Sequence, residues 1–137
     1  MSATALPLPP ARVVPAGVAA LAAGQLGLGL WMLVGPRSFY DALGPFGPFN
    51  EHYVLDVCTW YLALGIALAV AVRLASWRVP LLVFATVQYA LHTLNHVVDA
   101  GEADPGWVGV FDAVSLGVTA LLLAGLLLAA HQPEPRR

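Results

Sequence analysis

Four long apolar runs limit the folds that are open to this chain. They cover Val13–Gly35, Tyr53–Val72, Val79–Val98 and Trp107–Ala130. A helix over any of these runs would cross the ~30 Å hydrocarbon layer of a bilayer at about 1.5 Å per residue. The backbone of such a run finds no water in lipid, so it must satisfy its own hydrogen bonds. The runs therefore predict four transmembrane helices.

The composition supports a bilayer as the solvent of these helices. Of the 137 residues, 59% are apolar and 10% are charged, whereas soluble domains average about half apolar and about a quarter charged. A single Cys and only six basic residues exclude a disulfide scaffold, a Cys-rich zinc module and a basic nucleic-acid binder. We expect an all-α fold, an integral membrane antiparallel four-helix bundle that forms one domain over residues 1–137.

The distribution of charge predicts the orientation of the bundle. An even number of spans puts the N-terminus, the second connection and the C-terminus on one side of the membrane. That side carries five of the arginines and one acid, namely Arg12, Arg73, Arg78, Arg136, Arg137 and Glu134. The other side has Arg37 as its one arginine, together with seven acids. Because arginine is enriched on the cytoplasmic side, both termini are expected in the cytoplasm of a plasma-membrane protein.

The first run also resembles a signal peptide, because small residues at Val18–Gly24 are similar to a cleavage site. Its apolar core is longer than that of a signal peptide, however, and its leading segment has one Arg. Cleavage would leave three spans and put the termini on opposite sides. We therefore expect the first span to be retained.

Polar and ionisable residues recur at helical spacing in three of the predicted spans. Residues three or four apart share one face of a helix. The sets are Glu51, His52 and Asp56 in the second span, Gln88, His92, His96 and Asp99 in the third, and Asp112, Ser115 and Thr119 in the fourth. Each set therefore predicts a polar stripe on an otherwise apolar helix.

These stripes fall at similar depths when they are measured from the non-cytoplasmic ends of the spans. Asp56 lies ~6 Å deep and Asp112 ~7.5 Å deep, while His96 and His92 lie ~4.5 Å and ~10.5 Å below Asp99. An unpaired carboxylate in hydrocarbon costs several kcal/mol. We therefore expect the three stripes to face one another in the outer third of the membrane.

Imidazoles and carboxylates without thiolates are typical ligands of Zn²⁺, Fe²⁺, Mn²⁺ or Cu²⁺. The expected metal ligands are His52, Asp56, His92, His96 and Asp99. Glu51 or Asp112 would act as the catalytic acid or base. An open coordination position would activate water or oxygen. The site predicts either a membrane enzyme that acts on a lipid-soluble substrate or a metal-handling protein.

Other functions fit the same residues. Hydrogen bonds between the stripes could merely fix helix packing in a non-enzymatic accessory subunit. His52 and His92 could ligate a b-type haem. A proton relay is a further alternative. If no metal is present, at least one carboxyl of a facing pair such as Asp56 and Asp112 is expected to be protonated near neutral pH. A homo-oligomer or a larger membrane complex is also open.

The first connection combines a short helical segment with an aromatic, glycine- and proline-rich loop. Residues Arg37–Leu43 predict a short helix at the membrane interface, and Gly44–Phe49 supply the turns and aromatic anchors. This connection leads directly into Glu51 and His52. It is expected either to lie in the aromatic belt of the membrane or to form a lid over the polar residues.

Two motifs also carry a family resemblance. The segment Pro48–His52, followed by Asp56-Val57, and the later His92-x3-His96 resemble the P-[FY]-N-E-H-x3-D-V … H-x3-H pattern of small four-span integral membrane proteins common in actinobacteria. The resemblance implies a four-span fold with its polar residues in one cluster. The residues that match the pattern are Asn50, Glu51, His52, Asp56, His92 and His96. This chain differs by having Leu91 and Asn95 where such proteins have Pro and an aromatic residue.

Overall fold

The computed structural model describes residues 13–131, and this part of the chain is all-helical. A lone β-bridge between Phe46 and Ala103 is its single β-type pairing. The elements in chain order are α1 (Val13–Val34), α2 (Pro36–Leu43), α3 (Glu51–Arg73), the 3₁₀ turn η1 (Ala75–Trp77), α4 (Arg78–Val98) and α5 (Gly106–Ala130). Arg12, Glu134, Arg136 and Arg137, which contribute to the predicted orientation, lie outside the described residues.

The four apolar runs coincide with the four long helices, and each of these helices is long and apolar enough to cross a membrane. Helix α3 begins two residues before the predicted run because Asn50 caps it. The Asn50 side chain accepts a hydrogen bond from the backbone N–H of Tyr53 at 3.2 Å, as an N-cap residue does. The short helix expected in the first connection is present as α2, with Pro36 in its first turn.

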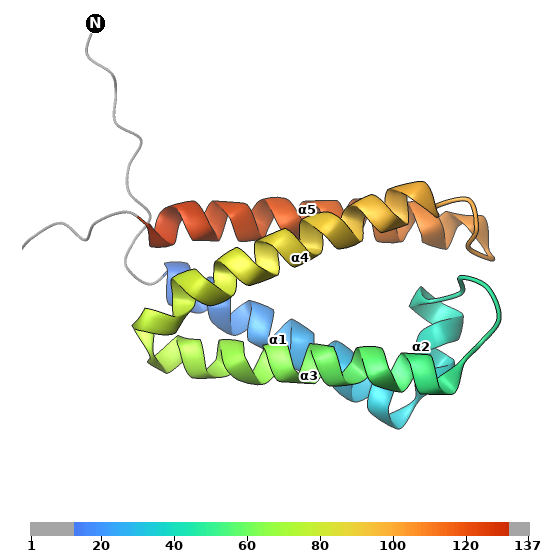
Figure 1. Cartoon of the computed structure of the whole chain (residues 1–137), viewed down its shortest axis with the longest axis horizontal. Helices are drawn as coiled ribbons and strands as arrows, with labels where there is room; N and C mark the ends of the chain where they lie inside the picture. Colours follow the sequence, from blue (N-terminus) through green and yellow to red (C-terminus); the bar gives the residue numbers. More distant parts are fainter. Residues whose placement is uncertain (1–12, 132–137) are drawn as a thin grey trace, which may run out of the picture.

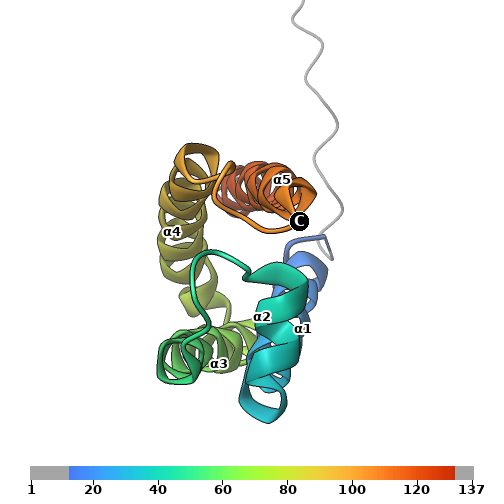
Figure 2. The same ribbon diagram turned by 90° about the vertical axis from the view of Figure 1, so that its right-hand side faces the viewer.

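The helices pair as two hairpins. Helix α1 packs along α3, and α4 packs along α5. The start of α1, the α3–α4 connection and the end of α5 lie at one end of the molecule, and α2 and the α4–α5 loop lie at the other (Figure 1). We call these the η1 end and the α2 end. Viewed from the α2 end, the four long helices occupy the corners of a quadrilateral, with α1 diagonal to α4 (Figure 2).

The contact between the hairpins changes along the bundle. Towards the η1 end, buried residues of all four long helices form one core, including Val18 on α1, Leu68 on α3, Leu82 on α4 and Leu123 on α5. Nearer the α2 end, the second core consists of residues of α1 and α3 alone: Met32, Val54, Cys58 and Tyr61. The hairpins therefore separate towards the α2 end.

Glycines hold α1 close to α3. A side chain at Gly29 would collide with Leu62, and one at Gly65 would collide with Leu26. The Cys58 thiol donates a hydrogen bond to the Gly29 carbonyl at 3.1 Å. Small residues thus allow the two backbones to approach, as they do in membrane helix pairs. Helices α1 and α3 are consequently closely packed against each other.

Candidate functional site

A cavity of about 380 Å³ lies where the two hairpins separate, beneath α2 and the loop that follows it. We call it the capped cavity. Its lining residues come from α1, α2, α3, α4 and the connections that follow α2 and α4: Met32, Phe39, Tyr40, Leu43, Gly44, Phe46, Pro48, Asn50, Tyr53, Val54, Val57, Tyr61, His92, Asn95, His96 and Asp99. The walls are mainly aromatic and aliphatic, with a few polar groups, as in many small-molecule sites.

Helix α4 contributes an imidazole pair to the wall of the capped cavity. His92 and His96 are one helical turn apart, and their Nε2 atoms lie 3.1 Å from each other. The Nδ1 atoms of both rings are buried and have no hydrogen-bond partner within residues 13–131. Asp99, one turn further along α4, lines the same cavity. The predicted stripe on the third span therefore does gather three ionisable groups in one place.

Helix α5 brings a buried carboxyl up to this pair. Asp112 is only 7% exposed, and its Oδ2 lies 3.9 Å from His96 Nδ1. That Oδ2 atom also has no hydrogen-bond partner among the described residues. Gly109, one turn before Asp112, makes the approach possible, because a side chain there would collide with the Ala100 backbone. The third and fourth spans thus meet at one depth, as their stripes predict.

The polar residues of α3 lie elsewhere. His52 Nε2 is 3.5 Å from Asp56 Oδ2, and these side chains are 86% and 66% exposed. Neither lines the capped cavity, and Glu51 and His52 border a separate, shallow hollow outside it. The structure therefore brings together His92, His96, Asp99 and Asp112 but leaves Glu51, His52 and Asp56 apart from them.

The rotation of α3 explains this separation. Val54, Cys58 and Tyr61 share the face that packs against α1. Residues two positions away point about 200° around the helix, which turns His52 and Asp56 outwards. Within residues 13–131, no group of three or more His, Cys, Asp or Glu side chains, those of α4 and α5 included, is arranged so that it could hold a metal. His52 and His92 do not face each other as a haem pair would.

The cap is attached to the opposite hairpin through the α4–α5 loop. Phe46 forms the lone β-bridge with Ala103, and the Asp104 N–H donates to the Pro45 carbonyl at 3.2 Å. The Phe46 ring also meets the His96 imidazole edge-on, with ring centroids 4.9 Å apart. The first connection therefore covers the imidazole pair. Of the two arrangements expected for this connection, the structure has the lid over the polar residues.

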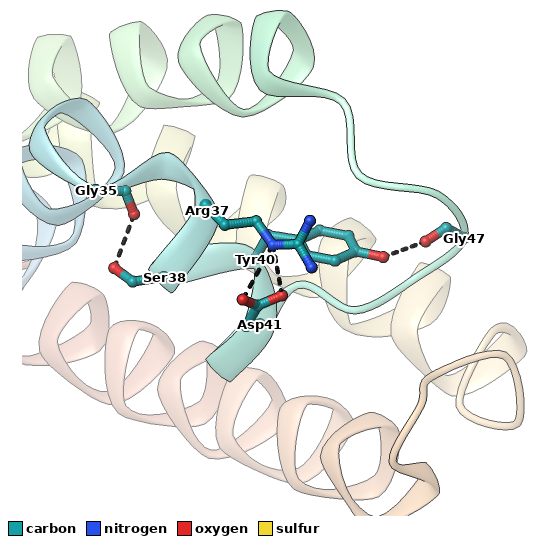
Figure 3. A network of polar contacts seen from close by, with 6 residues as sticks. All are labelled: Gly35, Arg37, Ser38, Tyr40, Asp41 and Gly47. Carbon is teal, nitrogen blue, oxygen red and sulfur yellow. Dashed lines mark hydrogen bonds and ion pairs between the residues drawn. The ribbon is translucent and has the colours of Figure 1, made fainter.

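Polar contacts within α2 and its loop hold the cap in shape (Figure 3). The Tyr40 hydroxyl donates to the Gly47 carbonyl, and Ser38 Oγ donates to the Gly35 carbonyl at 2.9 Å. On the exposed side, Arg37 Nε donates to Asp41 Oδ1 at 2.9 Å. This hydrogen bond, together with the charge of Asp41, raises the pKa of the Arg37 guanidinium. Arg37 is thus engaged outside the cavity, and no Arg lines the cavity itself.

A second polar link lies deeper in the bundle and was not anticipated from the sequence. The Gln25 side chain on α1 donates a hydrogen bond to the Tyr89 hydroxyl on α4, across the centre of the bundle. Gln25 is 3% exposed. The available signal was a lone amide in an otherwise apolar run. Tyr61, which also lines the capped cavity, gave no such signal because tyrosine is common in apolar runs.

Comparisons with family models, with curated proteins and with solved structures found no match to this chain. The resemblance to small four-span actinobacterial membrane proteins therefore stays a prediction.

Proposed function

We propose that this chain is a multi-pass plasma-membrane protein whose capped cavity holds one divalent transition metal, either as an enzyme acting on a lipid-soluble substrate or as a metal-handling protein. The four long helices would form an antiparallel bundle with both termini in the cytoplasm, as the distribution of arginine indicates. The capped cavity would then lie towards the extracytoplasmic side. The proposal rests on the geometry of the imidazole pair.

The separation of the two imidazoles suits a shared metal ion. Two nitrogen ligands of one tetrahedral Zn²⁺, at bond lengths of about 2.0–2.1 Å, lie about 3.3 Å apart. The Nε2 atoms of His92 and His96 are 3.1 Å apart at the cavity wall. A ligating imidazole usually turns its other nitrogen towards a carboxylate. His96 Nδ1, at 3.9 Å from Asp112 Oδ2, has such a carboxylate nearby.

The donor set assigns different roles to the acids. Asp99 shares the cavity wall with the two imidazoles and is the carboxylate available as a further ligand. Asp112 would orient His96 rather than act on a substrate. Glu51, His52 and Asp56 are too far around α3 to take part in this site. Water or an oxygen of the substrate would occupy the remaining coordination positions from the cavity, which is the arrangement of catalytic metal sites.

The charge of the cavity also favours a cation. Asp99 and Asp112 bring two carboxyl groups to this region, and no arginine lines the cavity. A carboxylate at membrane depth needs a proton, a protonated imidazole or a metal ion to balance it. A divalent ion bound by the imidazole pair would balance both carboxylates at once.

Elemental analysis of the protein, purified in detergent without added metal, tests this proposal directly. We expect about one equivalent of Zn, Fe, Mn or Cu per chain, and its loss in His92→Ala and in His96→Ala. His52→Ala serves as the matched control and should keep its metal, because the structure places His52 outside the cavity. Metal that is absent from the wild type, or equally present in His92→Ala, would refute the site.

A non-enzymatic accessory subunit is the second candidate. The observation in its favour is that Gln25–Tyr89 and His96–Asp112 each join two helices, so these polar groups could serve helix packing alone. In that case the purified protein would contain no metal or pigment, and His96→Ala would lower the unfolding temperature. A Soret band would instead indicate haem.

The orientation has its own test. A periplasmic-type reporter enzyme fused after Arg137 should be inactive, and a reporter that folds in the cytoplasm should be active. The opposite pair of results would refute the proposal that both termini are cytoplasmic. A fusion inserted in the α4–α5 loop, at Gly101, should give the reverse pattern and controls for expression.

A further inference from the structure

Another hollow runs along the outside of the bundle between α1 and α5. It has a volume of about 740 Å³ and extends from Val13 to Leu28 on α1 and from Thr119 to Ala129 on α5. We call it the α1–α5 groove. Helices α1 and α5 occupy neighbouring corners of the bundle (Figure 2) but make few direct contacts. The groove opens to the surface that lipid would contact.

The groove is open because glycine residues line part of it. Helix packing within the chain does not require glycine at two of these positions. A Cβ atom added at Gly24 or Gly125 would meet no other atom within 4 Å. At Gly17, in contrast, it would collide with Leu126. Glycine inside a helix is less stable than alanine, so Gly24 and Gly125 gain nothing for the isolated fold. Their effect is to leave room for something outside the chain.

An unsatisfied amide stands at the inner wall of the groove. Gln25 lines the groove and is 3% exposed. Its NH₂ group bonds to the Tyr89 hydroxyl, while its Oε1 atom has no partner among the described residues. Turning the amide over would exchange the two atoms and leave the NH₂ group unpaired instead. A buried amide with one free polar atom is costly, and a hydroxyl satisfies it in either orientation because it both donates and accepts.

The remaining lining restricts the ligand further. Among residues 13–131, none of those that line the α1–α5 groove is Asp, Glu, Arg or His, and the polar members besides Gln25 are Tyr89 and Thr119. A charged ligand would therefore find no counter-ion at this depth. The groove has the size of a typical small-molecule site and is otherwise lined by aliphatic side chains and glycine.

We propose that the α1–α5 groove binds an uncharged, lipid-soluble molecule with one hydroxyl group, which forms a hydrogen bond with the Gln25 amide. The hydrocarbon part of the ligand lies along Gly24 and Gly125, where the absent side chains let it contact the helix backbones. This site is separate from the capped cavity and needs no metal. Its failure would therefore leave the metal proposal intact.

Photolabelling in lipid nanodiscs tests the proposal. The probe is a long-chain alcohol with a diazirine in its chain, and the reference probe is the matching alkane without the hydroxyl. We expect the alcohol to label peptides of α1 and α5 about fivefold more than the alkane, since one net hydrogen bond favours it. Gln25→Leu should bring the ratio of the two labels to about one.

Three glycine variants locate the site. Gly24→Leu and Gly125→Leu should each lower labelling of the groove by both probes at least several-fold. Gly27→Leu is the matched control, because Gly27 also faces open space but does not line the groove. Equal labelling by alcohol and alkane in the wild type would refute the hydrogen bond. Unchanged labelling in both groove variants, or a dimer cross-linked through α1 and α5, would refute the site.

Discussion

The capped cavity and the α1–α5 groove are both hollows between helices, yet they are built in opposite ways. The capped cavity is roofed by α2 and its loop and has imidazoles and a carboxyl in its wall. In the part of the chain that the structure describes, the groove is open on its outer side and no charged residue lines it. The first is enclosed by a tethered loop and has a few polar side chains in a mainly aromatic and aliphatic wall. The second is open because glycine residues, Gly24 and Gly125, stand where larger side chains would fill the space.

This difference bears on what each hollow can bind. Charged groups at membrane depth need compensation, so under the metal proposal the capped cavity would take a cation with polar atoms near it. The groove offers one amide and an aliphatic surface, so it favours an uncharged molecule from the lipid. One small bundle thus provides two environments that accept different chemistry.

The largest expected effect contrasts Gly109, which lies against the α4–α5 loop, with Gly125 in the groove. Gly109→Ala should destabilise the protein by about 3 kcal/mol, because the new methyl group would overlap the Ala100 backbone, which cannot move like a flexible side chain. Gly125→Ala should stabilise it by about 0.5–1 kcal/mol, because the site is open and alanine favours the helix.

Reversible unfolding in mixed detergent micelles measures both values. A Gly109→Ala variant as stable as the wild type would show that the α4–α5 loop does not lie against α5 as described. A strongly destabilised Gly125→Ala variant would show that the groove is filled by the chain itself.

The sequence predicts the four long helices and the short α2 because hydrophobic run length and local capping are properties of neighbouring residues. It also predicts the face shared by His92 and His96, because spacing within one helix determines that face. It does not determine how one helix is rotated against another. Helix α3 is apolar around most of its circumference, so its polar stripe gave no indication that Val54, Cys58 and Tyr61 would be its packed face.

The groove could not be predicted for a related reason. Gly17, Gly24, Gly27 and Gly29 look alike in the sequence, and all of them suit close helix packing. The structure separates them, because Gly17 and Gly29 contact Leu126 and Leu62 whereas Gly24 and Gly27 face open space. That distinction depends on where the neighbouring helices lie.

The next largest effect concerns two acids at similar predicted depth. Asp112→Asn should weaken metal binding by about 10- to 100-fold, as loss of a carboxylate behind a ligating imidazole does. Asp56→Asn should leave the affinity unchanged, because Asp56 is exposed and pairs with His52. Competition with a chromophoric chelator measures both. Equal effects of the two variants on metal affinity would contradict the view that the carboxyl on α5, and not the one on α3, supports the metal site.

A smaller effect is expected from opening the cap. Phe46→Ala removes the ring that covers His96, so modification of His96 by diethylpyrocarbonate in metal-free protein should become several-fold faster. His52 is exposed and provides an internal reference within the same sample. Phe111→Ala, at an exposed position on α5, is the control for loss of an aromatic ring. An unchanged rate at His96 would show that the loop does not shield the pair.

The smallest effect is expected on the exposed side of the cap. Arg37 bonds to Asp41 at 2.9 Å and its guanidinium carbon lies 5.1 Å from the centre of the Phe49 ring. The pair is largely exposed, and exposed ion pairs contribute little to stability. Because the hydrogen bond to Asp41 raises the already high pKa of Arg37, the guanidinium stays charged across the accessible pH range. Arg37→Gln should therefore leave the unfolding temperature and the His96 modification rate unchanged. If Arg37→Gln instead made His96 react faster, as is expected for Phe46→Ala, the Arg37–Asp41 ion pair would be needed to hold the lid over His96. The exposed outer side of the cap would then matter as much to the cavity as the Phe46 ring on its inner side.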